Sequence, residues 1–336
     1  MGYLRPLVEP LLLAFAGSLL ITPVLRAFAH RLGFVDLPTS RKIHREPIAL
    51  LGGVAVYTSF AAALLFMGAN RGPLLGLLLG AGYLMVVGIV DDARGMNPWI
   101  KLLAQSGAAA VAVASGIHTT FLGTMYLNVP FTLLWIVGIT NAFNLLDNMD
   151  GLSAGVAMIS ASAFAILAAR YSEVGPEQAL TALAGAALAG SCLGFLRYNI
   201  VRASIFMGDA GSMVLGFTLA SLAALGSWRS PTVATSILIP ILVLAYPIFD
   251  TTLVTFLRLR EGRPVFRGGK DHSSHRLVSL GLGPTETVLL IYLFSICHAL
   301  TAALVTSVTL RLSLLALASS AAVMFIFGAV LRKARV

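Results

Sequence analysis

The chain has 336 residues, of which 58% are hydrophobic and only 11% are charged, with a mean hydropathy of +0.90 and a formal net charge of +9. A soluble domain carries about 25% charged residues, so this composition excludes an ordinary soluble fold and indicates an all-α integral membrane protein. The positive charge does not require a nucleic-acid partner, because membrane topology and anionic lipid account for part of it.

Apolar stretches long enough to cross a bilayer, about 20 residues each, recur along the whole chain. They are too long and too uniformly apolar for barrel strands, whereas helices satisfy their own backbone hydrogen bonds in hydrocarbon. The sequence therefore predicts about 11 transmembrane helices in a single membrane domain, residues 1–336. The predicted spans are residues 6–30, 48–69, 72–90, 99–117, 129–146, 152–170, 177–197, 211–227, 232–257, 285–308 and 312–331.

Basic residues gather on one side of the predicted bilayer. Only five of the 23 Lys and Arg residues fall on the other side, namely Arg5, Arg71, Arg170, Arg229 and Arg311. The positive-inside rule makes the rich side cytoplasmic, so we expect the N-terminus outside and the C-terminus inside a multi-pass inner (plasma) membrane protein. Most acidic residues also fall on the cytoplasmic side, which that rule does not require. We therefore expect the chemistry at the cytoplasmic membrane face.

The first predicted cytoplasmic loop contains "RKIHR", with Lys42 and His44, and is followed by Gly52 and Gly53. Clustered cations beside glycines that permit close helix packing suggest a phosphate-binding edge. The simpler alternative is ordinary positive-inside charge at a helix end.

Asp91 and Asp92 follow one another at the end of an apolar run, and Lys101 lies in the next helix. Adjacent helical residues point about 100° apart, so we expect the helix to break at the Ala-Arg-Gly turn directly after Asp92. Carboxylates at a membrane boundary need a metal, a cation or water. A purely structural pair is the alternative.

The stretch "NAFNLLDNMDGL" places Asn141, Asn144 and Asp147 three residues apart, so one helical face presents all three, and Asp150 extends the row. Mixed amide and carboxylate oxygens suit Mg²⁺, which keeps several waters and binds substrate phosphates. Zinc would need His and Cys, which are missing here. Simple helix capping is the alternative.

Two further loops complete the pattern. Asp209 lies between Gly208 and Gly211 at the start of a span, where a carboxylate complements the helix N-terminus and the glycines allow a phosphate or metal to approach. The last loop carries four candidate cations that suit a diphosphate, with a solvated basic loop as the alternative. They are Lys270, His272, His275 and Arg276. Together the loops indicate a Mg²⁺-bound diphosphate at a membrane surface.

Five stretches, in order between residues 36 and 283, resemble the polyprenyl-phosphate N-acetylhexosamine-1-phosphate transferases, which are glycosyltransferase family 4. They are "RKIH" with "GG", "DD" followed by "PWIKLLAQ", "NAFNLLDNMDGL", "FMGDAGS" and "DHSSHRL". The resemblance, closest to the GlcNAc-1-phosphate branch, implies transfer of a sugar-1-phosphate from a UDP-sugar to undecaprenyl or another polyprenyl phosphate. The products would be polyprenyl-diphospho-sugar and UMP, in the first membrane step of a cell-envelope glycan.

The same resemblance implies roles for individual residues. Asn144 and Asp209 would bind Mg²⁺, with Mn²⁺ as a substitute, and Asp91 and Asp92 would act catalytically on the lipid phosphate. Substrate binding would fall to Lys42, His44, Lys101, Asn141, Asp147, Asp150, His272, His275 and Arg276. A homodimer is compatible with the family. The chain departs from the family pattern at Ser274, where a histidine is usual, and at Ala49 and Leu50, where Pro-Arg is usual.

Physical chemistry favours direct attack over a covalent aspartyl-phosphate, because a lipid phosphate has a second pKa of about 6 and is already largely dianionic at neutral pH. Two other functions stay open at the level of sequence. A Mg²⁺-dependent intramembrane prenyltransferase would need two Asp-x-x-x-Asp motifs and gives the last loop no role. A transporter would place its charged groups near the membrane midplane.

Overall fold

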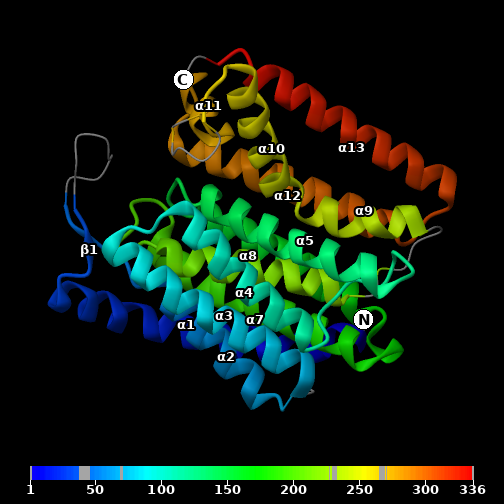
Figure 1. The fold of residues 1–336 in the computed structure, drawn as a ribbon, viewed down its shortest axis with the longest axis horizontal. Coiled ribbons are helices and arrows are strands. Elements are labelled where there is room, and N and C mark those ends of the chain that lie inside the picture. The colour runs from blue at the N-terminus through cyan, green and yellow to red at the C-terminus, as the bar shows by residue number, and fades with distance from the viewer. Residues whose placement is uncertain are drawn as a thin grey trace. The chain divides into compact units, whose positions relative to one another are not determined.

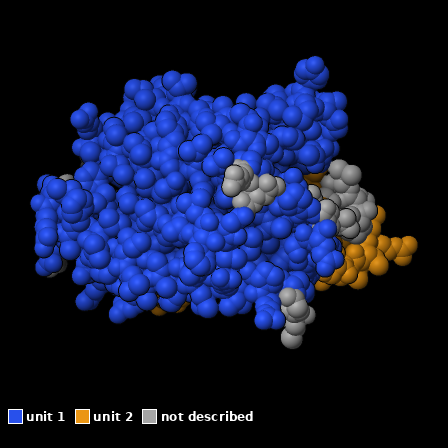
Figure 2. Space-filling model, turned by 90° about the horizontal axis from the view of Figure 1, so that it is seen from below, with its two compact units in different colours: residues 1–227 blue, residues 228–336 orange. Residues whose placement is uncertain are grey.

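The computed structural model describes residues 2–37, 46–68, 71–226, 228, 233–264, 269 and 271–334. The chain divides into two compact units, residues 1–227 and 228–336, which are coloured separately in Figure 2. Each unit is described by itself below. Apart from one short pair of strands, the regular structure of the described residues is helical, which confirms the predicted all-α class (Figure 1).

Unit 1 consists of helices α1 to α8 with two short 3-10 helices, and a small antiparallel pair in which Val35 of β1 faces Ala49 of β2. Its elements are η1 (Gly2–Leu4), α1 (Arg5–Leu32), β1 (Val35–Asp36), β2 (Ile48–Ala49), α2 (Gly52–Phe66), α3 (Arg71–Arg94), α4 (Pro98–Ala114), α5 (Met125–Leu146), α6 (Leu152–Ala169), η2 (Ser172–Val174), α7 (Pro176–Asn199) and α8 (Gly208–Leu225). Unit 2 contains α9 (Val233–Val243), α10 (Ala245–Arg260), α11 (Ser273–Ser279), α12 (Pro284–Val305) and α13 (Leu310–Leu331).

Eight helices in the described part of the chain are long and apolar enough to cross a membrane, or up to nine if a bent pair is one span. The chain is therefore a multi-pass membrane protein. Each of the predicted spans coincides with a helix or a pair of helices, but α2 and α4 have only 15 and 17 residues. The count of 11 spans and the orientation remain predictions.

The predicted span at residues 232–257 is broken rather than continuous. Residues 237–243 of α9 and α10 are bent by 80° at Leu244. Pro247 lies in the first turn of α10, and proline is tolerated there because the first N–H groups of a helix have no partner within the helix. The proline therefore marks the start of a new helix inside an apolar run.

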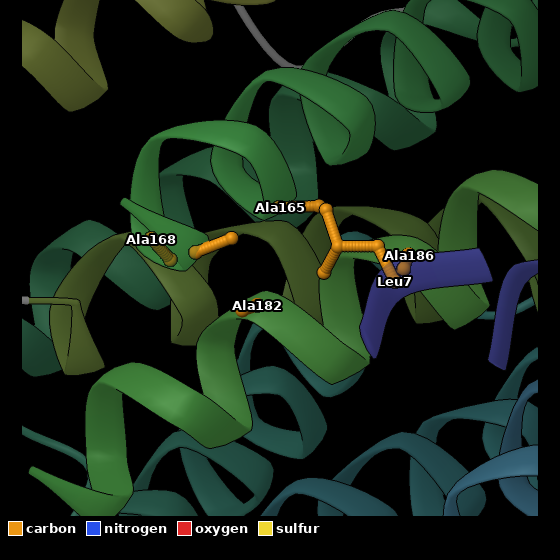
Figure 3. Close-up of a cluster of buried hydrophobic side chains, with 6 residues drawn as sticks. Leu7, Ala165, Ala168, Ala182 and Ala186 are labelled. Carbon is orange, nitrogen blue, oxygen red and sulfur yellow. The ribbon is translucent and has the colours of Figure 1, made fainter. Parts of the chain in front are cut away.

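Unit 1 is packed around α7 and α8. In their most apolar windows, 83% and 89% of residues are buried, whereas only 17% are in α1. Small residues make close packing possible: Leu7 of α1 lies against Ala165 and Ala168 of α6 and Ala182 and Ala186 of α7 (Figure 3). Without a hydrophobic driving force in lipid, such close approach supplies the packing energy between helices.

Glycines bring α2 and α3 against the first turn of α8. A Cβ on Gly53 of α2 would overlap the backbone of Gly211, and one on Gly88 of α3 would overlap Ala210. The N–H groups of Gly52 and Gly53 also donate to the carbonyls of Phe206 and Met207, at 3.0 and 2.9 Å. The start of α8, which carries Asp209, is therefore held firmly beside the end of α3.

Candidate functional site

Four helices of unit 1 meet at the ammonium group of Lys101. Its Nζ lies 2.5 Å from Oδ2 of Asp91 on α3 and 2.9 Å from Oδ2 of Asp209 on α8. It also donates to Oδ1 of Asn144 on α5, at 3.2 Å. The Asp91 side chain is 6% exposed and the Asp209 side chain 33%. Three side-chain oxygens therefore surround the Lys101 ammonium, and Asp209 is the more exposed of its two carboxylate partners.

Asp91 and Asp92 lie inside α3, which continues to Arg94 and stops where Gly95 takes a positive φ of 69°. The helix therefore ends within the predicted Ala-Arg-Gly stretch, but at its glycine, so that Asp92 is still followed by two helical residues. Because both residues are helical, their side chains leave the helix in different directions. Asp91 faces Lys101 and also accepts a hydrogen bond from the Met96 N–H at 2.6 Å, which ties down the turn after α3.

Asp92 caps the N-terminus of α8. Its Oδ1 accepts from the backbone N–H of Asp209 at 2.8 Å, and its Oδ2 accepts from that of Ala210 at 3.3 Å. A carboxylate suits this position because the first N–H groups of a helix lack partners and carry partial positive charge. Gly208 has a φ of 72°, and a Cβ there would lie 2.5 Å from Asp92 Oδ2.

Asn144 is fixed on both sides of its amide. Its Nδ2 donates to Oδ1 of Asp209 at 2.5 Å and to Oγ of the buried Ser212 at 3.0 Å, while its Oδ1 faces the Lys101 ammonium. The contact joins residues 65 positions apart. The two predicted metal ligands are therefore side by side, with the amide oxygen turned toward the position of a cation.

Asp147 follows the last residue of α5 with a ψ of 58°, so it lies just beyond the helical face that the spacing predicts. Burial raises the pKa of its carboxyl to about 8, and the negative charges of Asp209, Asp92 and Asp150 act in the same direction. Protonated Asp147 can donate a hydrogen bond at neutral pH.

Asp150 holds a loop rather than pointing freely into a pocket. Its Oδ2 accepts from the Ala203 N–H at 2.9 Å. The next residue, Gly151, has a φ of 74° and donates from its N–H to Oδ1 of Asn199 at 3.0 Å, and Asn199 in turn donates to the Ile205 carbonyl at 2.9 Å. These bonds fasten the segment after α5 to the segment before α8.

Of the remaining predicted residues, some are described by the structure and others are not. Asn141 lies one turn before Asn144 on α5 and is partly buried. Lys42 and His44 lie outside the described residues, as does Lys270 of the last predicted loop.

In unit 2 the residues around the start of α11 are held from α10. Arg258 forms two hydrogen bonds with Asp271, from Nε at 2.8 Å and from Nη2 at 2.6 Å. The guanidinium lowers the pKa of Asp271 to about 2. Arg276 donates from Nε to the Asp271 carbonyl at 2.9 Å and from Nη1 to the Ala334 carbonyl at 3.1 Å. Two of its nitrogens therefore stabilise the fold instead of being free for a ligand.

His272, which precedes the first residue of α11, contacts Asp250 of α10 through its Nδ1 at 2.8 Å. Both residues are buried, with exposed fractions of 4% and 1%. His275, on α11, is partly buried. Both predicted histidines therefore lie at the start of α11, and His272 is tied there to the carboxylate of Asp250.

Comparison with known proteins decides the family. The family described as Glycosyl transferase family 4 matches residues 74–227, which contain the Lys101 group. The chain is 36% identical over 318 residues to a protein of Bacillus subtilis named probable undecaprenyl-phosphate N-acetylglucosaminyl 1-phosphate transferase, covering 92% of this chain and 87% of that one. The chain belongs to glycosyl transferase family 4.

Two other similar proteins have related names. The decaprenyl-phosphate N-acetylglucosaminephosphotransferase of Mycolicibacterium smegmatis is 32% identical over 327 residues, covering 86% of this chain and 80% of the relative. The undecaprenyl-phosphate alpha-N-acetylglucosaminyl 1-phosphate transferase of Yersinia pestis is 29% identical over 299 residues, covering 84% and 80%. The resemblance noted from the five sequence stretches is thereby confirmed.

Three residues of this family 4 chain have roles that the sequence interpretation did not assign. Ser212 supports the amide of Asn144, Asp250 supports His272, and Arg258 supports Asp271. Asp250 and Arg258 did leave a signal, because ionisable residues in or next to an apolar span need a partner or a function. Ser212 left none, since a small hydroxyl residue in a membrane helix is common.

Proposed function

We propose that this family 4 chain transfers GlcNAc-1-phosphate from UDP-GlcNAc to undecaprenyl phosphate, releasing UMP in the first membrane step of a cell-envelope glycan. The observation that carries the proposal is the meeting of Asp91, Lys101 and Asp209, with Asn144, at the ends of four helices. This arrangement supplies both anionic and cationic groups to a phosphate. The relatives' names supply the donor sugar and the lipid class.

The residues of the site fit Mg²⁺. Among the described residues, no group of three or more His, Cys, Asp or Glu side chains could hold a metal ion by itself. Mg²⁺ needs less than that, because it binds through one or two carboxylates and completes its shell with water and substrate phosphates. Asp91, Asp209 and the amide oxygen of Asn144 already surround one cation, the ammonium of Lys101. We propose that Asn144 and Asp209 hold Mg²⁺, with Mn²⁺ as a substitute, and that Lys101 then moves onto a phosphate.

The proposed reaction is a direct displacement at phosphorus. An oxygen of the lipid phosphate forms a bond to the sugar-bearing phosphorus, the bond from that phosphorus to the bridging oxygen breaks, and UMP leaves with the electron pair. Bound Mg²⁺ would offset negative charge on the diphosphate. The ammonium of Lys101 acts in the same sense, since preorganised charges stabilise the transition state without further reorganisation.

Little general-base catalysis is required, because the lipid phosphate is largely dianionic at neutral pH. The geometry of Asp92 agrees with this: both of its oxygens accept backbone hydrogen bonds from α8. Asp92 therefore acts in this proposal by positioning Asp209, and Asp91 acts by positioning Lys101. Trapping a phospho-enzyme on Asp91 or Asp92 would contradict the direct route.

We further propose the orientation that the charge distribution predicts, with the N-terminus outside, the C-terminus inside and the site at the cytoplasmic face of the inner membrane. The site residues lie near helix ends: Asp209 is the second residue of α8 and Asn144 the third from the end of α5. This placement disfavours a transporter, whose site would lie near the midplane. Membership in a family with phosphotransferase relatives disfavours a prenyltransferase.

The experiment is UMP release by the purified chain in detergent, with undecaprenyl phosphate, Mg²⁺ and a panel of UDP-sugars. We expect release that requires the lipid phosphate and is greatest with UDP-GlcNAc. Asp209→Asn and Lys101→Met should each abolish it, whereas Glu9→Gln, which changes an exposed carboxylate in α1, should not. Release of UMP without lipid phosphate, or none with any UDP-sugar, would refute the proposal.

A further inference from the structure

A chain of hydrogen bonds in unit 2 ends at His272. Oδ1 of Asp250 accepts from both the N–H and the hydroxyl of Ser273, at 2.7 and 2.5 Å. Oδ2 of Asp250 faces Nδ1 of His272 at 2.8 Å. The hydroxyl of Tyr246 lies 2.7 Å from Ser273 Oγ. Because the Ser273 hydroxyl donates its proton to Asp250, the Tyr246 hydroxyl must donate to Ser273. Both carboxylate oxygens of Asp250 therefore have hydrogen-bond partners.

This network fixes the histidine ring. Asp250 is 1% exposed and His272 4% exposed, so neither side chain is free to rotate into solvent. A carboxylate only accepts hydrogen bonds, so Nδ1 of His272 carries the proton. The neighbouring residue, Asp271, is fastened separately by Arg258, two turns after Asp250 on α10. Asp271, His272 and Ser273, three consecutive residues at the start of α11, therefore all form hydrogen bonds with α10.

Nε2 is the ring nitrogen left over. In the described part of the chain, the contacts of the His272 ring with hydrogen-bonding groups are confined to Nδ1. A histidine whose one nitrogen is held by a buried carboxylate presents the other in a fixed direction, as metal-binding and catalytic histidines do.

We propose that Asp250 is a positioning residue for the sugar-nucleotide: it accepts a hydrogen bond from Nδ1–H of His272, and when the UDP-sugar binds, the ring, protonated at both nitrogens, donates from Nε2–H to a phosphate oxygen. This inference rests on the proposed function. The anionic carboxylate also stabilises the positive charge that the ring carries when both nitrogens are protonated. Neither the sequence motif nor the family comparison assigns a role to Asp250.

The geometry predicts what Asp250→Asn does. The Ser273 side of the network offers two donors, so the amide oxygen must turn toward Ser273. The amide NH₂ then faces Nδ1 of His272, which must become an acceptor. The ring is forced into the tautomer protonated only at Nε2, and it can no longer become a cation without losing a hydrogen bond.

The first test does not depend on catalysis. The chain contains six histidines, so ¹⁵N labelling of their rings gives a resolvable spectrum, and His272→Gln identifies the signals of His272. In the wild-type protein, at neutral pH and without substrate, we expect Nδ1 of His272 to be protonated. In Asp250→Asn we expect Nδ1 to be unprotonated and Nε2 to be protonated. An unprotonated Nδ1 in the wild type, or an unchanged pattern in the variant, would overturn the proposal, and the wild-type result stands even if the variant does not fold.

The second test uses UMP release. Asp250→Asn should raise the KM for UDP-GlcNAc, lowering kcat/KM about 10- to 100-fold, as expected for a hydrogen bond from a charged donor. In a His272→Gln background the same change should cost little more, because Asp250 acts through His272. Additive losses would contradict this. The matched control is Thr251→Val, an isosteric change in the next residue of α10, whose buried Oγ1 has no hydrogen-bond partner among the described residues.

The two proposals fail separately. If no UDP-sugar gives UMP but the tautomer of His272 follows Asp250, the positioning stands and the donor assignment falls. If UMP is released normally by Asp250→Asn with an inverted tautomer, the assignment of His272 to the donor falls instead.

Discussion

Asp92 and Asp209 are joined by a 2.8 Å hydrogen bond from the backbone N–H of Asp209 to Oδ1 of Asp92, although 117 residues separate them in the chain. The end of α3 thereby caps the start of α8. The carboxylate that sequence interpretation assigned to catalysis is occupied by this contact and by a second one to Ala210. We therefore expect its effect on the reaction to pass through the position of Asp209.

Asp92→Asn tests this positioning. Asn remains a good helix cap, but its NH₂ would face the Ala210 N–H, so we expect a loss of about 1 kcal/mol in the free energy of unfolding. UMP release should fall about tenfold, because Asp209 moves slightly. Loss of a general base would instead cost about 10²- to 10⁴-fold with little change in stability. Thermal unfolding in detergent and steady-state kinetics of the same preparation distinguish the two.

Gly208→Ala tests the space beside the cap, with Gly95→Ala as a matched control. Both glycines have a positive φ, 72° and 69°, so alanine is strained at either position, by about 1 kcal/mol. Of the two, only the added Cβ at Gly208 meets Asp92 Oδ2, at 2.5 Å, whereas no atom of the described residues lies within 4 Å of a Cβ at Gly95.

We therefore expect both variants to lower the melting temperature but only Gly208→Ala to lower kcat strongly. Equal effects of the two on kcat would mean that backbone strain, and not displacement of Asp92, controls the site.

The pKa of Asp147 predicts a pH dependence of stability. The carboxyl ionises near pH 4 when unfolded but near pH 8 when folded. Between these values the unfolded state binds fewer protons, so the free energy of unfolding falls as pH rises from about 4 to about 8. Asp147→Asn cannot ionise and should remove this contribution.

The measurement is the melting temperature of both proteins from pH 5 to pH 8.5. We expect the difference between Asp147→Asn and the wild type to grow in favour of the variant as pH rises. A difference that is constant with pH, or that changes in the opposite direction, would show that Asp147 is ionised in the folded protein.

The sequence predicts well what local rules determine. Long apolar stretches predicted the helices. The pairing of Asn144 with Asp209 came from the family resemblance, and the structure places Asn144 Nδ2 2.5 Å from Asp209 Oδ1. The helix break within residues 232–257 was missed although Pro247 marks it, because an apolar run of membrane-spanning length outweighed one proline.

What depends on distant contacts could not be predicted. Asp91 contacts Lys101 whereas Asp92 caps α8. This difference arises because α3 continues to Arg94 and α8 starts beside it. The attachment of Asp150 to Ala203 requires knowing how the segment before α8 returns to the loop after α5. Spacing along the chain contains neither fact, since both arise from helices that meet only in the folded protein.

The ion pairs of Asp271 in unit 2 permit a comparison of a buried and an exposed partner. Arg258 is 4% exposed and binds Asp271 at 2.6 Å, whereas Arg263 is 46% exposed and lies 3.2 Å from the same carboxylate. Removing one partner of a buried pair leaves an uncompensated charge and costs about 3–5 kcal/mol, while an exposed pair contributes about 0–1 kcal/mol.

We therefore expect Asp271→Asn to lower the free energy of unfolding by several times more than Arg263→Gln does. The depressed pKa of Asp271, about 2, adds a pH signature. Its stabilising contribution is complete above the unfolded pKa of about 4 and is lost as pH falls toward 2. The wild type should therefore lose stability relative to Asp271→Asn as pH falls from 5 toward 3. Equal costs of the two substitutions at pH 7 would mean that Arg258 finds another counter-charge when Asp271 is removed.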